Sequence, residues 1–268
     1  MAKTKNSRYI HGTSDEEQQR LSKLNDLTNA SFVSFVKVRK TDNVLELGSG
    51  LGILAEMISR KLTHGSVTGI EISEAQIAKC PPVSKRLSFI HGDVHQLPFA
   101  NDSFDVVYCR YILEHVTDPL GVLNQARRVL KPGGRVYIQE NSVLLLEFFP
   151  DCPGFKEVWK AFARYQCSIG GDAMIGLALY DLLRRTGFAE TVLSMAPEIH
   201  YHETGTLVPW IDNLISILRV ARDPLIIHKF ISAEQYTTAT EELEAFKINP
   251  YASSYFYWNR ATAKKPPT

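Results

Sequence analysis

Residues 44–52 read Val-Leu-Glu-Leu-Gly-Ser-Gly-Leu-Gly, and this stretch decides the fold. A short apolar run of β-forming residues ends at Leu47, glycines follow at 48, 50 and 52, and a helical pattern begins at Ile53. Glycine is needed where the backbone takes a positive φ angle or lies against a ligand. A glycine turn between a strand and a helix N-terminus therefore predicts a cradle for a nucleotide-type ligand.

The spacing of this turn is Glu-x-Gly-x-Gly-x-Gly, starting at Glu46. It differs from the Gly-x-Gly-x-x-Gly fingerprint of dinucleotide-binding proteins. An acidic residue two places before the first glycine suits a ligand with a positive charge, not a pyrophosphate. Taken alone, the turn could also serve only to reverse the chain, as such turns do in many α/β proteins.

The composition is that of an ordinary soluble globular protein. The 268 residues are 44% hydrophobic and 22% charged, which fits one large domain or one domain with an insertion. The 30 basic and 29 acidic residues give no overall field that would favour nucleic acid or a membrane surface. We therefore expect neither nucleic acid nor a membrane as a partner, and a homo-oligomer is left open.

The four cysteines (Cys80, Cys109, Cys152 and Cys167) show no Cys-x-x-Cys spacing. This favours a reducing compartment without disulfides or a zinc ribbon. No signal-type segment or apolar run of membrane-spanning length is present, so we expect a cytoplasmic protein. His200 and His202 have the spacing of metal ligands on a strand, but edge-strand polarity explains them better, and no metal site is expected.

Strands and helices alternate along the first half of the chain. The pattern predicts strands at 43–47, 66–71, 87–91, 104–109 and 135–140, with helices at 51–62 and 119–130. The second half predicts helices at 153–168 and 175–186, a β-prone stretch at 190–202, and a helical block at 206–245 with Pro224 between two helices. The aromatic run Ser253–Arg260 predicts a last strand at the sheet edge.

These elements suggest four segments. Residues 1–40 would form an N-terminal helical flap or cap, and residues 41–205 a ligand-binding α/β core. Residues 206–245 would form a helical insertion that caps an acceptor site, and residues 246–268 the final core strand and tail. The open ends of the strands are where such a cap would bury its apolar face and exclude water.

Polar residues stand at successive strand ends, where ligands bind on open α/β sheets. Glu71 follows the second predicted strand, about 20 residues after the glycine turn, and its carboxylate could accept both hydroxyls of a ribose. Asp93 follows the third strand and could accept an exocyclic amine. Singly, Glu71 is also an ordinary helix N-terminal charge and Asp93 an ordinary turn former. Turns alone hardly explain the whole ordered series.

As a set, these runs resemble the class I S-adenosylmethionine-dependent methyltransferases, in the branch that methylates quinones, sterols and specialised metabolites. The matching runs are Val44–Gly52, Gly69–Ser73, Gly92–Phe99, Phe104–Pro119 and Val129–Gly134. The resemblance implies a Rossmann-like α/β fold: a seven-stranded, mostly parallel sheet with helices on both faces. It also implies S-adenosylmethionine as the cofactor and S-adenosylhomocysteine as the product.

The resemblance further implies roles for single residues. Glu46 and the glycine-turn backbone would hold the methionine end, Glu71 the ribose, and Asp93 the adenine amine. Arg110 would line the methionine side by its backbone. The full set of implied cofactor-binding residues is Tyr9, Glu46, Gly48, Ser49, Gly50, Gly52, Glu71, Ile72, Gly92, Asp93, Val94 and Arg110. Tyr9 resembles part of an N-terminal flap and could face the sulfonium, or it could be an exposed aromatic on a tail.

The catalytic residues stay open. The reaction would be direct displacement at the methyl carbon, which needs positioning and a general base only if the acceptor must lose a proton. Glu114 and His115 are expected to be structural. Candidates for the base, none of them favoured by the sequence, are His11, Tyr111, Glu140, Tyr165 and His200. The acceptor would be a small hydrophobic or aromatic metabolite, methylated on oxygen, nitrogen or carbon.

Two other functions fit parts of the pattern. A non-catalytic subunit that binds S-adenosylmethionine for a partner would keep the same acidic residues. A nicotinamide-dependent dehydrogenase would use a similar sheet, but the glycine spacing disfavours it. The chain has Cys109-Arg110-Tyr111-Ile112 where DNA-adenine and protein-glutamine methyltransferases have Asp/Asn-Pro-Pro-Tyr, so those substrates are not expected.

Overall fold

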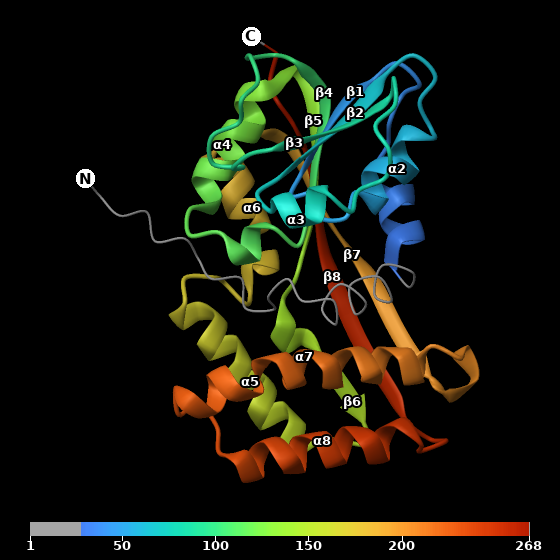
Figure 1. The fold of residues 1–268 in the computed structure, drawn as a ribbon, viewed down its shortest axis with the longest axis vertical. Coiled ribbons are helices and arrows are strands. Elements are labelled where there is room, and N and C mark those ends of the chain that lie inside the picture. The colour runs from blue at the N-terminus through green and yellow to red at the C-terminus, as the bar shows by residue number, and fades with distance from the viewer. Residues whose placement is uncertain (1–27, 268) are drawn as a thin grey trace. The chain divides into compact units, whose positions relative to one another are not determined.

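The computed structural model describes residues 28–267, so Tyr9 and His11 lie outside the described part of the chain (Figure 1). The chain divides into two compact units. The core unit holds Asn29–Glu140, Ile175–Met195 and the residues from Asn259 onward. The helical unit holds Asn141–Met174 and Ala196–Trp258. The strands β7 (Ala189–Tyr201) and β8 (Ser253–Lys264) contribute residues to both units.

The core unit is built on a mostly parallel sheet. Its first five strands are β1 (Asn43–Leu47), β2 (Ser66–Glu71), β3 (Leu87–His91), β4 (Phe104–Arg110) and β5 (Leu130–Glu140). They lie in the order β3-β2-β1-β4-β5, all parallel, and β8 follows antiparallel to β5 and also pairs with β7. Within the described residues the core sheet therefore has the seven strands that the sequence predicted. An eighth strand, β6 (Glu147–Phe149), pairs with β8 inside the helical unit.

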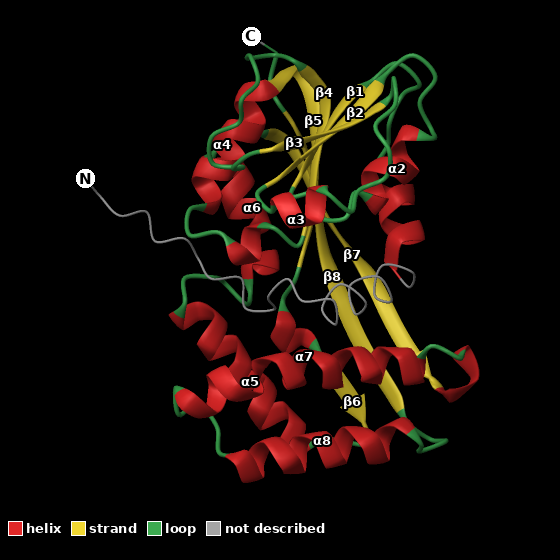
Figure 2. Ribbon diagram, viewed as in Figure 1, coloured by secondary structure: helices red, strands yellow, loops and turns green. Residues whose placement is uncertain are grey.

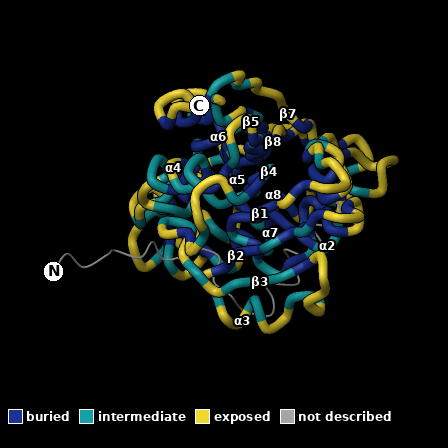
Figure 3. Tube along the Cα trace, turned by 90° about the horizontal axis from the view of Figure 1, so that it is seen from above, coloured by how far each residue is buried: buried dark blue, intermediate teal, exposed yellow. Residues whose placement is uncertain are grey.

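Helices cover both faces of the core sheet, as predicted (Figure 2). Successive strand residues point to opposite faces. Leu45 and Leu47 pack with α4 (Pro119–Val129) and α6 (Ile175–Arg185), which are seen together on one side of the sheet in Figure 2. Val44 faces the other way, toward α2 (Ile53–Ser59). Figure 3 shows the central strands as mainly buried, so both faces are used for packing.

The described end of the expected N-terminal cap is part of the core unit. Residues 28–35 are helical, and Phe32, Val33 and Val36 belong to the buried cluster on the α2 face. Phe32 also contacts Tyr108 of β4, with ring centroids 5.9 Å apart. Thus this helix helps to hold the sheet, whatever role the preceding residues have.

Aromatic packing holds the helical unit together. Its helices are α5 (Pro153–Ser168), α7 (Leu207–Ile227) and α8 (Ala233–Lys247), with short 3₁₀ turns η2 (Val143–Leu145) and η3 (His202–Thr204). Phe148 of β6 meets Phe155 edge to face at 5.2 Å and Phe246 at 5.0 Å. Trp159 stacks on Phe162 at 5.0 Å. These side chains are buried.

Three sequence expectations differ from the structure. Pro224 lies inside α7 instead of between two helices. Proline cannot donate the backbone hydrogen bond of a regular helix, but the buried side of α7 continues from Ala221 to Leu225. The final strand β8 lies between β5 and other strands instead of at the sheet edge. Residues 141–174, expected in the core, belong to the helical unit. In the part of the chain that the structure describes, no helix has both the length and the apolar character needed to cross a bilayer.

Glu140 is the last residue of β5, and its carboxyl group holds the turn η1 (Leu113–His115) in place. Its Oε1 accepts hydrogen bonds from the N–H groups of Ile112 (3.0 Å) and Leu113 (2.9 Å), and its Oε2 accepts one from Glu114 (3.3 Å). Burial, together with the nearby Glu114 carboxyl, raises the pKa of Glu140 to about 8. Both oxygens are thus engaged with the backbone, which supports a structural part for this candidate base.

We predict that Glu140→Ala lowers the free energy of unfolding by about 2–4 kcal/mol, because buried N–H groups of η1 lose their acceptor. Denaturant unfolding followed by circular dichroism measures the change. Glu140→Gln keeps one acceptor oxygen and should lose clearly less. Equal stability of the alanine variant and the wild type would show that η1 does not depend on this cap.

Candidate functional site

The glycine turn after β1 is shaped both by the backbone and by close packing. Gly48 and Gly50 have φ angles of 67° and 53°, a region that residues with a Cβ rarely adopt. A Cβ on Gly48 would lie 2.0 Å from Cδ1 of Ile112, so packing fills that space. A Cβ on Gly50 would have Oε1 of Gln76 as its nearest neighbour, at 3.2 Å. Within 4 Å, this flexible side-chain end is the one described neighbour of such a Cβ, so packing is looser at Gly50 than at Gly48.

The buried carboxyl of Glu46 and the buried hydroxyl of Tyr108 interact with each other. No other hydrogen-bond partner among residues 28–267 reaches Oε2 of Glu46, the Tyr108 hydroxyl or Oγ of Ser49. Glu46 and Tyr108 are direct neighbours on β1 and β4. Buried polar atoms are nearly always paired, because leaving one unpaired costs about 1–3 kcal/mol. This group therefore fits the charged and polar end of a small ligand, such as the amino-acid end of S-adenosylmethionine.

The charge state of Glu46 is set by its surroundings. Burial raises the pKa of this carboxyl to about 8, although the neighbouring Tyr108 hydroxyl and Arg110 guanidinium act in the opposite direction. At neutral pH the carboxyl is therefore largely protonated. A cationic ligand group beside it would favour the ionised form and release the proton.

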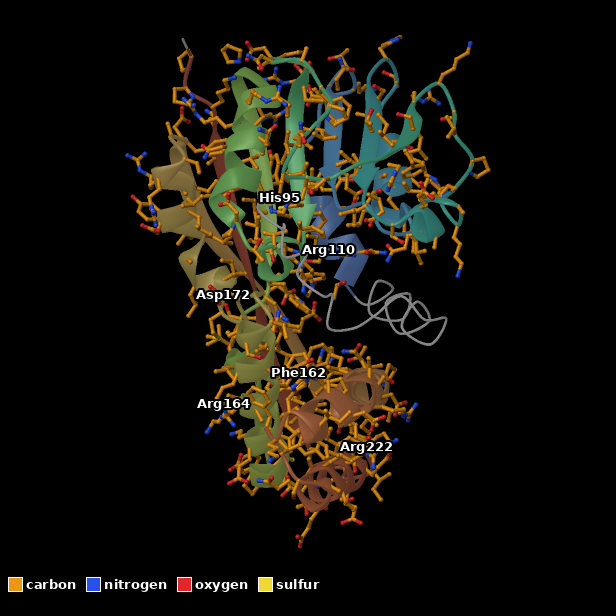
Figure 4. The ribbon with its side chains drawn as sticks, turned by 60° about the vertical axis from the view of Figure 1, so that its left-hand side comes forward. His95, Arg110, Phe162, Arg164, Asp172 and Arg222 are labelled. Atoms are coloured by element: carbon orange, nitrogen blue, oxygen red, sulfur yellow. The ribbon has the colours of Figure 1, made fainter. Side chains whose placement is uncertain are left out.

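The side chain of Arg110 extends the site toward the helix of residues 28–35 (Figure 4). It donates a hydrogen bond to Oδ1 of Asn29 at 2.8 Å. The guanidinium also lies over the rings of Phe32 (5.4 Å) and Tyr111 (5.2 Å). The sequence analysis considered only the backbone of Arg110, but the structure places its side chain in the electrostatic environment of Glu46.

The carboxylate of Glu71 connects the end of β2 to the glycine turn. Its Oε2 accepts a hydrogen bond from the N–H of Gly50, and its Oε1 accepts one from the N–H of Ser73, both at 2.9 Å. Each oxygen keeps lone pairs that could accept ligand hydroxyls. The next residue, Ile72, has 61% of its surface exposed, an apolar side chain beside this polar group.

Asp93 follows β3, next to the end of β2, where Glu71 and His91 are neighbours. Its carboxylate accepts hydrogen bonds from the backbone N–H of His95 (2.8 Å) and from Nδ1 of the same residue (2.7 Å). Partial burial opposes ionisation, yet the bonds from His95 hold the pKa of Asp93 below its usual value. Of the flanking predicted residues, a Cβ on Gly92 would lie 2.9 Å from Ile70, and Val94 packs against the core.

Of the catalytic candidates, Tyr111 is in the core unit. It directly follows β4 with a φ angle of 60°, unusual for a residue other than glycine. Its hydroxyl accepts a hydrogen bond from Nε2 of Gln139 at 2.7 Å. Oε1 of the same amide accepts one from Arg260, also at 2.7 Å. Tyr111 is thus held by a chain of side chains across β4, β5 and β8.

Tyr165 and His200 belong to the helical unit. Tyr165 stacks on His228, with ring centroids 5.6 Å apart. His200 is buried, its Nδ1 hydrogen-bonds with the hydroxyl of Thr206 at 2.8 Å, and its ring stacks on Trp210 at 4.7 Å. Burial lowers the pKa of His200 to about 4. The expectation of edge-strand polarity is therefore wrong for His200. As for metals, the described residues contain no group of three or more side chains that could hold one.

Sequence reasoning missed Tyr108, His95 and the Gln139–Arg260 pair. Tyr108 reads as a core residue until its pairing with Glu46 is known. Gln139 pairs with Arg110 on one side and with Arg260 on the other, which only the sheet register reveals. His95 could have been found from its position two residues after Asp93, the reach of an Asx turn.

Comparison with known proteins matches residues 45–138 to the family described as "Methyltransferase domain". A demethylmenaquinone methyltransferase from Listeria welshimeri is 32% identical over 145 residues, which cover 52% of this chain and 59% of that protein. The chain thus spans less than two thirds of the length of the curated relatives it matches.

Solved structures of methyltransferases have a similar fold. A candidate methyltransferase from Bacillus halodurans superposes with a TM-score of 0.61 at 18% identity, covering 89% of this chain and 98% of that one. A phosphoethanolamine N-methyltransferase from Haemonchus contortus, solved with S-adenosylhomocysteine, gives 0.55 at 18% identity, covering 93% of this chain and 52% of that one. At these identities the likeness shows the fold alone.

We predict that Gly50→Val lowers the affinity for S-adenosylhomocysteine at least about 100-fold, because the branched side chain enters ligand space. Gly133→Val is a matched control: Gly133 also has a positive φ angle (74°), and a Cβ there would meet nothing within 4 Å. Both variants should lose about 1–3 kcal/mol of stability from the backbone strain. Calorimetry would contradict the cradle if the two variants bound the ligand equally well.

We predict that binding of S-adenosylhomocysteine strengthens with pH between about 5.5 and 7, by up to about tenfold per unit, because protonated Glu46 must lose its proton to pair with the ligand ammonium. The free energy of unfolding of the protein without ligand should instead decrease as the pH rises. The folded-state pKa is raised, so the protonated form stabilises the fold, and this stability is lost as pH rises toward about 8. Glu46→Gln should flatten the binding profile and reduce the slope of the stability profile, to which the buried Glu140 carboxyl also contributes. Titration calorimetry and melting curves across this range test the assignment, and an unchanged pH slope in the variant would refute it.

Proposed function

Residues 45–138 belong to the class I S-adenosylmethionine-dependent methyltransferase family, and from this membership we propose that the chain transfers a methyl group to a small-molecule acceptor. The observation that carries the proposal is the group of buried polar atoms near the glycine turn at Glu46, Ser49 and Tyr108, which have hydrogen-bonding capacity that no other described residue uses. They supply the ionic and hydrogen-bonding groups that an amino-acid moiety needs.

When bound, S-adenosylmethionine supplies a methyl group on a sulfonium, which is already a strong electrophile. Glu46 would release its proton and pair with the ligand ammonium, and Ser49 and Tyr108 would hydrogen-bond to the same end. Glu71, held by the N–H groups of Gly50 and Ser73, would accept the ribose hydroxyls. Every one of these side chains lies in the core unit.

The adenine would lie at the ends of β2 and β3. Ile72 offers an exposed apolar side chain for stacking, and the carboxylate of Asp93 offers an acceptor for the exocyclic amine. This division of roles explains why an exposed isoleucine stands directly after a buried acidic residue.

The chain needs to supply little chemistry beyond positioning and water exclusion, because the methyl donor is activated before it binds. Tyr111 is a candidate base in the core unit, and its hydroxyl accepts a hydrogen bond from the Gln139 side chain. We therefore place it first among residues to be tested for proton removal from an acceptor.

We propose a small hydrophobic or aromatic acceptor. The name of the Listeria relative points to a demethylated quinone, and that of the Haemonchus structure to a phosphorylated amine. An acceptor screen should therefore contain both classes. The four cysteines are all free thiols, which fits the cytoplasmic compartment we propose.

The experiment has two stages. Calorimetry and thermal shift compare S-adenosylhomocysteine with NAD, and the proposal requires binding of the first alone. Incubation with methyl-labelled S-adenosylmethionine and a metabolite extract then tests turnover. Binding without any labelled product would favour a non-catalytic partner subunit, and stabilisation by NAD would favour a dehydrogenase.

We predict that Glu71→Ala weakens binding of S-adenosylhomocysteine by about 1–3 kcal/mol, because the ribose hydroxyls lose a charged acceptor. Glu74→Ala is the control, since Glu74 also carries an acidic group near the start of α3 (Glu74–Ile77) but makes no bond to the glycine turn in the described structure. Equal affinities of the two variants would sink the ribose assignment.

A further inference from the structure

The turn that follows β3 brings two donors of one residue onto one carboxylate oxygen. The backbone N–H of His95 and its ring atom Nδ1 both lie within hydrogen-bond distance of Oδ1 of Asp93, at 2.8 and 2.7 Å. The backbone C=O of Asp93 also accepts a bond from the N–H of Gln96, which closes a turn. The backbone bonds alone are those of an ordinary Asx turn. The ring contact is additional, and the turn does not require it.

The chemistry of the contact fixes the protonation of the ring. A carboxylate can only accept, so Nδ1 must be the atom that carries a hydrogen. The opposite atom, Nε2, is buried and has no hydrogen-bond partner within residues 28–267. The polar contacts of the ring are therefore confined to its Nδ1 side, and its polar effect on the site passes through Asp93.

This arrangement keeps the second oxygen of Asp93 available. Among the described residues, no group hydrogen-bonds to Oδ2, and about half of the Asp93 side chain is exposed. A carboxylate pinned at one oxygen by two donors cannot rotate without losing both bonds. Its other oxygen then faces a ligand in one orientation, as an acceptor only.

The neighbouring strand supplies the apolar half of the same site. Ile72 follows Glu71 on β2, and Glu71 pairs with His91 on β3. Nε2 of His91 hydrogen-bonds with the C=O of Ile72 at 3.0 Å, which holds the ends of the two strands together. An exposed isoleucine and an oriented carboxylate thus follow the ends of two neighbouring strands, a combination suited to a flat base with an amino group.

We propose that His95 is a positioning residue that makes the site select adenine over bases with a carbonyl at the same place, by holding Asp93 so that Oδ2 accepts the exocyclic amine. The inference rests on the proposed function, because it requires that an adenine nucleoside binds here. The proposed function assigns Asp93 as the acceptor of the amine. This inference adds that His95 determines the selectivity for a base that carries this amine.

Three variants separate this role from a structural one. His95→Ala keeps the backbone N–H and hence the turn, but removes the ring donor. His95→Asn places an amide nitrogen where Nδ1 lies and has no atom in the place of Nε2. It should therefore restore the selectivity for adenine. Asp93→Asn replaces the acceptor itself and gives the affinity ratio expected when the carboxylate is absent.

The probes are S-adenosylhomocysteine and its deaminated analogue S-inosylhomocysteine, which has a carbonyl oxygen in place of the amine. Calorimetry gives the ratio of the two affinities for each protein. We expect a ratio of about 50 or more in the wild type, because the analogue sets a carbonyl oxygen against a carboxylate. His95→Ala should reduce the ratio about fivefold to tenfold, His95→Asn should keep it within about twofold, and Asp93→Asn should bring it near one.

A merely structural role would lower both affinities together and leave the ratio unchanged. The inference would be overturned if His95→Ala kept the wild-type ratio of affinities. It would also be overturned if His95→Asn reduced that ratio as much as His95→Ala. The proposed function would stand in both cases. A wild-type protein that binds both probes equally would also overturn the inference alone. A wild-type protein that binds neither probe would overturn the proposed function, and this inference with it.

Discussion

The hydrogen bond from the N–H of Gly50 to the carboxylate of Glu71 is the interaction on which the site depends. It ties the turn after β1 to the end of β2, so two strands present their ligand-binding groups in one fixed arrangement. Gly50 itself has a positive φ angle of 53°, which glycine adopts readily. The same carboxylate also accepts a bond from Ser73, the N-cap of α3. One buried acidic group therefore orders the turn, the start of α3 and the candidate ribose site together.

Glu46 shows the cost of this arrangement. A carboxyl in the interior of a parallel sheet is unfavourable when ionised, which is why its pKa rises to about 8. An apolar residue at this position would pack without that cost. The fold retains a group that stabilises it only in the protonated state, and this is typical of a position kept for binding instead of for stability. The buried hydroxyl of Tyr108, which interacts with the Glu46 carboxyl, fits the same view.

The part of the sheet formed by β4, β5 and β8 is built differently, from a row of polar side chains in register. Arg110, Gln139 and Arg260 are neighbours on β4, β5 and β8, and they lie on the face that packs against the helix of residues 28–35. Because the guanidinium of Arg260 can only donate, it fixes the orientation of the Gln139 amide, which then donates to Tyr111. The side chain of Tyr111, a residue with an unusual backbone angle, is thus held by a chain of hydrogen bonds from β5 and β8.

The sequence by itself determined the alternation of strands and helices, the glycine turn and the acidic residues at successive strand ends, because these depend on local periodicity and on chain reversal. It also determined Glu46, Glu71 and Asp93 as candidates, since each stands at a strand end that the pattern defines. It could not place β8 inside the sheet or assign residues 141–174 to the helical unit, because strand order and unit limits are set by contacts far apart in the chain. For the same reason it could not determine the partners of Glu46, the burial of His200, or the chain of bonds from Arg260 to Tyr111. Those follow from sheet register and packing, which exist only once the tertiary structure has formed.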